Sequence, residues 1–373
     1  MKIYCYARTL FLCLTMLAAS SLSLSQPDAV VPMEEAFWSV EGEVSFITHK
    51  GVAAIRLDTR SSRAELKAMD FANGTIEFDV KPVNGDFTGI DFRKSKQGDS
   101  ETFYLRTFEP HDLKSPTAIQ YAPVIKGVNL WNLYAEHQAP ALIVGNTWNH
   151  VKLVVSGKRL LVFVNADEQP SLEVTHLEGE SSSGTISFYG NAIFANLRVD
   201  RNAVAGLTAN ASDVNTRSDP RYLRAWKASS VSPLAEGIDL RPGDIPVATA
   251  TWKALQAEQK GLVNLSRYYN LLDGRHVIWL KTTINSDYDQ RKRVAIGFSD
   301  EVWVFANGKY AFVDKNLYGQ PIMKKPEGRV SAENASFELP LVKGSNEIVI
   351  GVANNFFGWG LMFRLDNLVG VTF

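Results

Sequence analysis

The sequence predicts an all-β protein of two jelly-roll β-sandwiches in tandem, joined by a linker. Apolar and polar side chains alternate with period two in many segments after residue 38, and the apolar periodicity of helices is nearly absent. Length supports the same prediction, since 373 residues suffice for two domains of roughly 150 residues, each with its own core.

The first 25 residues are predicted to be a secretory signal peptide. Lys2 and Arg8 precede an apolar run over residues 10–19, and small residues lead to an expected cleavage near Ser25. The apolar run is too short to span a bilayer, and no later segment is suited to do so. Both cysteines lie inside this segment, so we expect a disulfide-free protein in the periplasm of a bacterial cell or outside it.

The charge of the chain bears on its partners. Without Lys2 and Arg8, the 39 basic residues fall to 37 against 40 acidic ones, a net charge of −3. No long block of like charge occurs, whereas nucleic acids and anionic membrane surfaces require a concentrated basic patch. This balance excludes both as expected partners and favours a polysaccharide or oligosaccharide.

Residues 33–200 are predicted to form the first sandwich. Apolar positions alternate with charged ones along residues 75–81, as in a half-buried strand. Residues 156–159 separate two apolar runs and predict a tight hairpin, and residues 185–199 close the domain.

A linker is predicted over residues 201–220, where the composition is small, polar and without period. Residues 221–373 are predicted to form the second sandwich, with residues 221–246 as an arm along a sandwich. The Asn307-Gly308 dipeptide predicts a two-residue turn because both residues tolerate positive φ. Residues 302–306 are all apolar, as in a strand that is covered on both faces.

Three short motifs resemble the concanavalin A-like sandwich of laminin-G-type lectins, glucanases and 3-keto-disaccharide hydrolase-like domains. They are Gly-Thr-Ile-Glu-Phe-Asp-Val at residues 74–80, Gly-Ile-Asp-Phe-Arg at 89–93 and Trp-Asn-His-Val-Lys at 148–152. The resemblance implies a jelly roll whose concave sheet lines a sugar groove.

Residues 238–373 resemble the galactose-binding-like jelly rolls that accompany β-galactosidases. The match runs through residues 297–300, 304–308, 344–346 and 358–360 in this order. The resemblance implies either a carbohydrate-binding module or a structural spacer, because this fold serves both roles.

Polar and aromatic side chains on two predicted strands form the first candidate site. Asp91 alternates with Arg93, and Tyr104 with Arg106, so neighbouring strands would bring the four together on the concave face. Guanidinium and carboxylate groups bind sugar hydroxyls, and aromatic rings stack on pyranose faces. The expected sugar-contacting residues there are Asp91, Arg93, Tyr104, Arg106, Tyr121 and Trp131.

A second candidate site lies in the predicted loop around residues 354–359. Asn354, Asn355 and Trp359 stand beside a glycine, which allows close approach of a ligand. Binding there and on the first site would raise the avidity for one polymer.

No residue is predicted with confidence to be catalytic. Glu77 and Asp79 share one face of a strand, but the carboxylate that a retaining glucanase needs further along is replaced by Pro82. We therefore expect two solvated acids and a non-catalytic carbohydrate-binding, lectin-like protein. Two alternatives stay open: a glycoside hydrolase or lyase of the 3-keto-disaccharide type acting through Asp91, and a protein-binding adhesion or scaffold module.

The only metal that the sequence predicts as possible is a structural calcium ion. Six histidines are scattered without paired spacing, which disfavours zinc. Carboxylate and amide oxygens suit a structural calcium ion, and the candidates are Asp300, Glu301, Asp314, Asp366 and Asn367.

Overall fold

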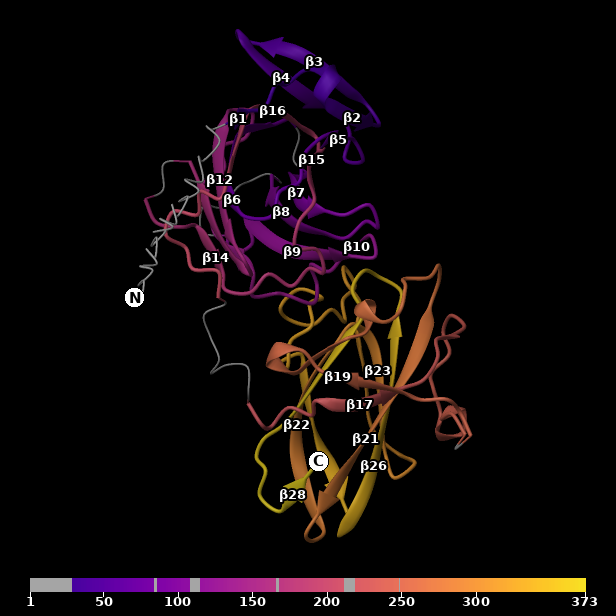
Figure 1. The fold of residues 1–373 in the computed structure, drawn as a ribbon. Coiled ribbons are helices and arrows are strands. Elements are labelled where there is room, and N and C mark those ends of the chain that lie inside the picture. Colours follow the sequence, from indigo (N-terminus) through magenta and orange to yellow (C-terminus); the bar gives the residue numbers. More distant parts are fainter. Residues whose placement is uncertain (1–28, 84–85, 108–114, 166–167, 211–218, 248) are drawn as a thin grey trace, which may run out of the picture.

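The computed structural model describes residues 29–373 except 84–85, 108–114, 166–167, 211–218 and 248. The predicted signal peptide, residues 1–25, lies outside the described residues. Throughout the described part every strand pairing is antiparallel, and the strands form two β-sandwiches (Figure 1). The all-β prediction with two jelly-roll sandwiches is confirmed.

The N-terminal sandwich contains β1–β16, arranged in two eight-stranded sheets. In what we call the back sheet, the order is β14-β13-β12-β6-β16-β4-β3, and β1 pairs with β16. Its strands are β1 (Ala29–Val30), β3 (Val44–His49), β4 (Val52–Leu57), β6 (Gly74–Pro82), β12 (Asn149–Ser156), β13 (Arg159–Val164), β14 (Leu172–Val174) and β16 (Ala192–Arg201).

The second sheet, here called the front sheet, has the order β10-β9-β8-β7-β15-β5-β2, and β11 pairs with β9. The core lies between the sheets, where Phe188 of the front sheet stacks on Phe194 of the back sheet with ring centroids 4.2 Å apart. Its strands are β2 (Trp38–Glu41), β5 (Arg63–Leu66), β7 (Phe87–Lys94), β8 (Ser100–Arg106), β9 (Ile119–Ile125), β10 (Val128–Asn129), β11 (Gln138–Ala139) and β15 (Thr185–Gly190).

The C-terminal sandwich contains β17–β28. Its larger sheet consists of β17 (Ala225–Ala228), β18 (Ser232–Pro233), β19 (Lys253–Gln256), β21 (His276–Ser286), β23 (Asp300–Ala306), β24 (Lys309–Asn316), β26 (Gly344–Asn354) and β28 (Val371–Thr372). Its smaller sheet consists of β20 (Leu262–Asn264), β22 (Gln290–Phe298), β25 (Ala335–Leu341) and β27 (Gly360–Leu365). Among the described residues, short 3-10 helices are η1 (Glu35–Phe37), η3 (Pro242–Asp244), η4 (Gln259–Gly261) and η5 (Leu265–Arg267).

Local sequence signals account for the hairpins. Ser156 pairs with Arg159 at the turn between β12 and β13. Ala306 pairs with Lys309 across Asn307-Gly308, whose φ angles of 51° and 74° are both positive. Both predicted turns are confirmed.

Residues 229–246 cover the outer face of the larger C-terminal sheet. Leu234 and Leu240 of this segment are buried against Trp279, Trp303 and Phe305, in a cluster apart from the main core of the sandwich. The cover explains why β23 carries apolar side chains on both faces, because neither face meets water.

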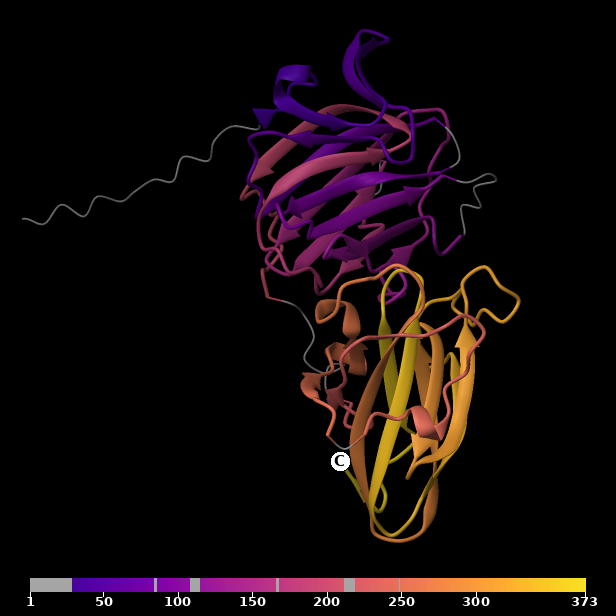
Figure 2. The ribbon, with the colours of Figure 1, turned by 90° about the vertical axis from the view of Figure 1, so that its right-hand side faces the viewer.

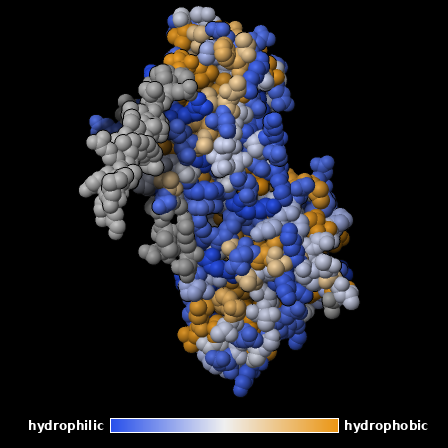
Figure 3. Space-filling model, in the orientation of Figure 1, coloured by the Kyte–Doolittle hydropathy of each residue, from blue (hydrophilic) through white to orange (hydrophobic). Residues whose placement is uncertain are grey.

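The two sandwiches meet end to end (Figures 1 and 2). Leu130 and Leu133 from the first pack with Leu262 and Val330 from the second. Hydrophilic residues dominate the side of this meeting zone that faces the viewer in Figure 3. The junction therefore has an apolar centre with a polar surround, as protein interfaces commonly do.

A polar network around Arg267 reinforces the junction. Its guanidinium donates to the Glu258 carboxylate and, across the junction, to the Glu178 carbonyl oxygen (2.7 Å) and the Glu180 carboxylate (2.5 Å). Tyr134 of the N-terminal sandwich donates to Glu258 at 2.7 Å. These groups satisfy one another in a zone partly shielded from water, which favours a single docking arrangement.

Candidate functional site

The register of the front sheet places several predicted residues on its outer face, away from the core. Asp91 lies opposite Thr102, and Tyr104 lies opposite Gly89 on one side and Gln120 on the other. Directly opposed residues of antiparallel strands project to the same face. Asp91, Tyr104 and Arg106 therefore share a face, as the alternation predicted.

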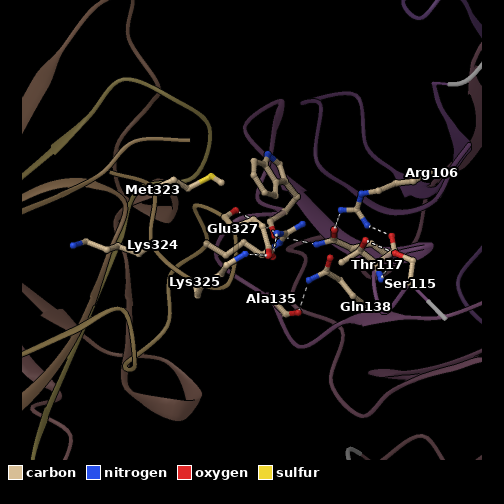
Figure 4. Close-up of polar contacts among 12 residues, drawn as sticks. Arg106, Ser115, Thr117, Ala135, Gln138, Met323, Lys324, Lys325 and Glu327 are labelled. Atoms are coloured by element: carbon tan, nitrogen blue, oxygen red, sulfur yellow. Dashed lines mark hydrogen bonds and ion pairs between the residues drawn. The ribbon is translucent and has the colours of Figure 1, made fainter. Parts of the chain in front are cut away.

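Gln120 connects this polar face into a hydrogen-bonded chain. The Tyr104 hydroxyl donates to Gln120 Oε1 at 2.8 Å, and Arg106 donates to the same oxygen. Arg106 also donates to the Thr117 carbonyl oxygen (Figure 4). Gln120 Nε2 donates in turn to the carbonyl oxygen of Trp131 at 3.0 Å. Gln120 was not among the residues expected at this site. Its position next to Tyr121 in a strand of period two would have indicated that it lies on the opposite face from Tyr121.

Burial shifts the pKa values of Tyr104 and Arg106 in this hydrogen-bonded group. It raises the pKa of Tyr104 to about 12, so the phenol stays neutral and keeps its proton for donation. It lowers the pKa of Arg106, although a guanidinium remains charged at physiological pH. The face thus presents a half-buried cation that is held by neutral oxygens.

Asp91 is deeply buried and already paired. Its Oδ2 accepts from Arg63 Nη1 at 3.0 Å, and the Arg63 guanidinium also lies over the Tyr189 ring, 5.1 Å from its centroid. Burial raises the pKa of Asp91, against the opposing charge of Arg63. A ligand on this part of the face would meet the half-exposed Arg63 before Asp91.

Arg93 does not share the face of Asp91, and that prediction is wrong. Its φ of 52° and a register shift in the opposing β15 break the alternation of the strand. The guanidinium turns to the backbone, donating to the Ala72 carbonyl oxygen from Nε (2.8 Å) and to the Gly157 carbonyl oxygen (2.8 Å). Arg93 is buried and ties together loops at one end of the sandwich.

Tyr121 was also expected on the outer face and instead points into the core. It lies opposite Phe103, one position away from the Tyr104–Gln120 pair, so it projects to the other side of the sheet. Its hydroxyl donates to Glu101 Oε2 at 2.6 Å. Burial raises the pKa of both groups, and the pair is a structural feature of the interior.

An aromatic cluster lies where the outer face meets the C-terminal sandwich. The Trp131 ring has its centroid 5.0 Å from that of Tyr318 and 5.8 Å from that of Phe357. Tyr318 stacks on Phe356 at 5.5 Å with an interplanar angle of 11°, and Tyr318 is 49% exposed. Trp131 thus lies between both sandwiches, as part of a partly exposed aromatic surface.

The second predicted site is only partly available. Trp359 is 3% exposed and belongs to the core of the C-terminal sandwich, with its indole N–H directed to the Val352 carbonyl oxygen. Asn354 is buried and accepts from the Phe356 backbone N–H at 2.6 Å, which shapes the loop. The prediction that Asn354 and Trp359 contact sugar is wrong, because both side chains are buried and already make contacts within the protein. Asn355 is exposed.

Glu77 and Asp79 lie on the outer face of the back sheet. Asp79 is 2.8 Å from His150 Nδ1 and accepts from Asn196 Nδ2 at 2.7 Å, and Glu77 lies opposite Lys152. Burial acts to raise the pKa of Asp79, but hydrogen bonds from His150 and Asn196 hold it below the ordinary value. These acids are ion-paired surface groups, as expected.

The oxygen groups considered for calcium have protein partners. Asp300 accepts from the backbone N–H groups of Asn355 and Phe356, and Glu301 pairs with Arg275. Asp314 pairs with Lys324. Within the described ranges, no group of three or more His, Cys, Asp or Glu residues is arranged to hold a metal ion.

A helix suited to crossing a bilayer is not found among the described residues. Comparison with models of protein families finds no match, and neither does comparison with curated proteins.

Several solved structures resemble part of the chain. The carbohydrate-binding module CBM66 from Bacillus subtilis is 14% identical, with 43% of this chain and 92% of that one covered and a TM-score of 0.33. The Ca²⁺/Man3GlcNAc-bound exoplasmic/lumenal domain of VIP36 is 11% identical, with 48% of this chain and 89% of that one covered and a TM-score of 0.34. Bacillus licheniformis β-glucanase is 11% identical, with 48% of this chain and 100% of that one covered and a TM-score of 0.32. These partial likenesses assign no ligand or activity, and the galactose-binding-like resemblance of residues 238–373 stays a prediction.

Proposed function

We propose that the protein is an exported, non-catalytic carbohydrate-binding protein. It holds a polysaccharide or oligosaccharide on the outer face of the front sheet, between Arg63 and the aromatic surface around Trp131. The observation that carries the proposal is that the hydrogen-bonded groups of Tyr104, Arg106 and Gln120 lead to the backbone of Trp131, whose ring contacts the exposed Tyr318.

The chemistry of this surface suits sugars. A pyranose presents hydroxyl groups at its edge and apolar C–H groups on its face, and it therefore needs hydrogen-bond donors beside an aromatic ring. Arg63 and Arg106 supply donors, and Tyr318 supplies an exposed ring. Export is part of the same proposal and rests on the order of basic, apolar and small residues before Ser25.

Saturation-transfer NMR with a panel of neutral and acidic oligosaccharides tests the proposal. We expect transfer to the sugars while their anomeric signals persist, and loss of transfer in Trp131→Ala. Trp148→Ala is the matched control, because Trp148 is a partly buried tryptophan of the same sandwich that packs on His49 instead. Silence across the panel, or equal transfer in Trp131→Ala, would overturn the proposal.

Asp91 supports a second candidate function, glycoside cleavage. Burial raises the pKa of the Asp91 carboxyl, which is the direction of shift that general acids require. The same NMR experiment, run over hours and including 3-keto disaccharides, would then show new anomeric signals that Asp91→Asn slows strongly. Unchanged substrate signals would exclude this candidate.

A further inference from the structure

Two arginines from different sandwiches share one environment at the junction. Arg106 ends β8, and Arg329 lies in the segment between β24 and β25. Arg106 donates to Gln120, and Gln120 donates to the Trp131 carbonyl oxygen at 3.0 Å. The Arg329 guanidinium lies over the Trp131 ring with 4.9 Å to the centroid. Figure 4 shows Arg106 on one side of the junction and Lys325 and Glu327 on the other. We call these two guanidinium groups together the arginine niche.

The positive charge of Arg106 has no anionic partner among the described residues. It donates to the Thr117 carbonyl oxygen, to Gln120 Oε1 and, at 3.4 Å, to the Tyr104 hydroxyl, all of them neutral. Neutral acceptors compensate a desolvated cation less well than a carboxylate does. Arg106 can therefore gain from an added anion.

Arg329 is also poorly compensated. It is 5% exposed, its guanidinium lies over the Trp131 ring with 4.9 Å to the centroid, and its Nε has no hydrogen-bond partner within the described chain. Its nearest carboxylate is that of Glu327, 3.6 Å from Nη1 and already 2.6 Å from Lys325. Burial, and then the like charge of Arg106, lower the pKa of Arg329.

Two under-compensated cations that repel each other across a junction destabilise it unless something offsets them. In the same segment, Lys324 pairs with Asp314 and Lys325 pairs with Glu327. These two lysines therefore occupy the nearby carboxylates, and Arg329 gains little charge compensation from them. A bound anion would supply the missing charge, and planar guanidinium groups match carboxylate and sulfate oxygens in particular.

We propose that the arginine niche binds the anionic group of an acidic glycan, a uronate carboxylate or a sulfate ester. This inference rests on the proposed function and specifies its ligand class. The sugar ring that carries the anion lies on the exposed Tyr318–Phe356 stack beside the niche. The ligand thereby bridges the two sandwiches.

Calorimetric titration with paired ligands tests the proposal. Oligogalacturonate is compared with its methyl ester, and heparin oligosaccharides with desulfated ones, so that each pair differs in charge on one backbone. We expect the charged member of one pair to bind at least about tenfold more tightly, with affinity falling as salt rises. Which pair responds distinguishes carboxylate from sulfate.

Arg329→Gln should weaken binding of the charged member by about tenfold or more and leave binding of its neutral counterpart unchanged. Arg106→Gln should weaken binding of the charged member by about tenfold more than binding of the neutral one, because Arg106 also donates to sugar hydroxyls. Lys343→Gln is the control, since it removes one positive charge from an exposed side chain of the same sandwich and leaves the Lys325–Glu327 pair intact. We expect less than about a twofold effect from it. If Arg329→Gln fails to fold, Arg106→Gln and Arg106→Lys decide the question.

The outcomes separate this inference from the proposed function. Equal binding of charged and neutral members, or binding of neutral glycans alone, overturns the arginine niche and leaves carbohydrate binding standing. Equal losses in Lys343→Gln and Arg106→Gln also overturn it, because they indicate a general charge effect. Absence of binding to every sugar tested removes both proposals.

Discussion

Asn132 of the N-terminal sandwich and Gly358 of the C-terminal sandwich exchange two hydrogen bonds. Asn132 Nδ2 donates to the Gly358 carbonyl oxygen at 2.9 Å, and the Gly358 N–H donates to Asn132 Oδ1 at 2.9 Å. The Asn132 carbonyl oxygen also accepts from the Val330 N–H at 2.8 Å. Through its side chain Asn132 thus holds the loop after β26, and through its backbone it holds the segment that carries Arg329.

Replacing Asn132 by alanine tests this connection. The change leaves the buried N–H and carbonyl groups of Gly358 without their partner, and each unsatisfied group costs about 1–3 kcal/mol. We expect the free energy of unfolding, measured by urea denaturation, to fall by about 2–4 kcal/mol. Asn355→Ala, which truncates an exposed asparagine nearby, should change it by less than about 0.5 kcal/mol.

Gly358 allows the close approach of the two sandwiches. A Cβ added there would lie 2.6 Å from Asn132 Oδ1 and 2.7 Å from Leu133 Cγ. Gly358→Ala should therefore force the junction apart, lowering both the melting temperature and glycan affinity. Gly243→Ala is the control, because a Cβ at Gly243 meets nothing within 4 Å. Equal melting temperatures for the two variants would contradict this account of the junction.

Arg93 should prove structural, in contrast to Arg106. Truncation to alanine removes charge-assisted hydrogen bonds to the Ala72 and Gly157 carbonyl oxygens, each worth about 1.5–3 kcal/mol. We expect Arg93→Ala to lower the free energy of unfolding by about 3 kcal/mol or more while sugar affinity of the folded fraction stays unchanged. A selective loss of sugar binding without loss of stability would return Arg93 to the binding site.

Asp300 should make stability depend on pH. Burial raises its pKa to about 7, although N–H groups of Asn355 and Phe356 oppose the shift, and Glu301 adds to it. In an unfolded chain the same carboxyl titrates near pH 4, so the folded protein binds the proton more tightly. Its contribution is thus fully present below about pH 4 and is lost as the pH rises through about 7.

Comparison of wild type with Asp300→Asn isolates this contribution. Both free energies of unfolding are measured by urea denaturation between about pH 4 and about pH 8. The free energy of unfolding of the wild type should fall relative to that of Asp300→Asn as the pH rises. Other buried acids titrate in both proteins and cancel in the difference. A difference that is flat over this range would show that Asp300 titrates normally.

The strands and hairpins followed from local signals in the sequence. Alternation along residues 75–81 and the Asn307-Gly308 turn act between near neighbours, so their outcome depends little on distant parts of the chain. The shared face of Asp91, Tyr104 and Arg106 also followed, because alternation persists wherever a strand stays regular.

Tertiary structure decided the remaining site features. The left-handed φ at Arg93 broke the alternation, and the pairing register turned Tyr121 inward. Packing in the C-terminal core withdrew Trp359, which composition alone could not distinguish from an exposed aromatic.

By itself, then, the sequence determined the fold class, the turns and one polar face, because each depends on side-chain periodicity or on local backbone preference. The meeting of Arg329 with Trp131 was decided only by docking of the two sandwiches, since no periodicity connects residues so far apart in the chain. Their contact depends on how the ends of two separate cores fit together.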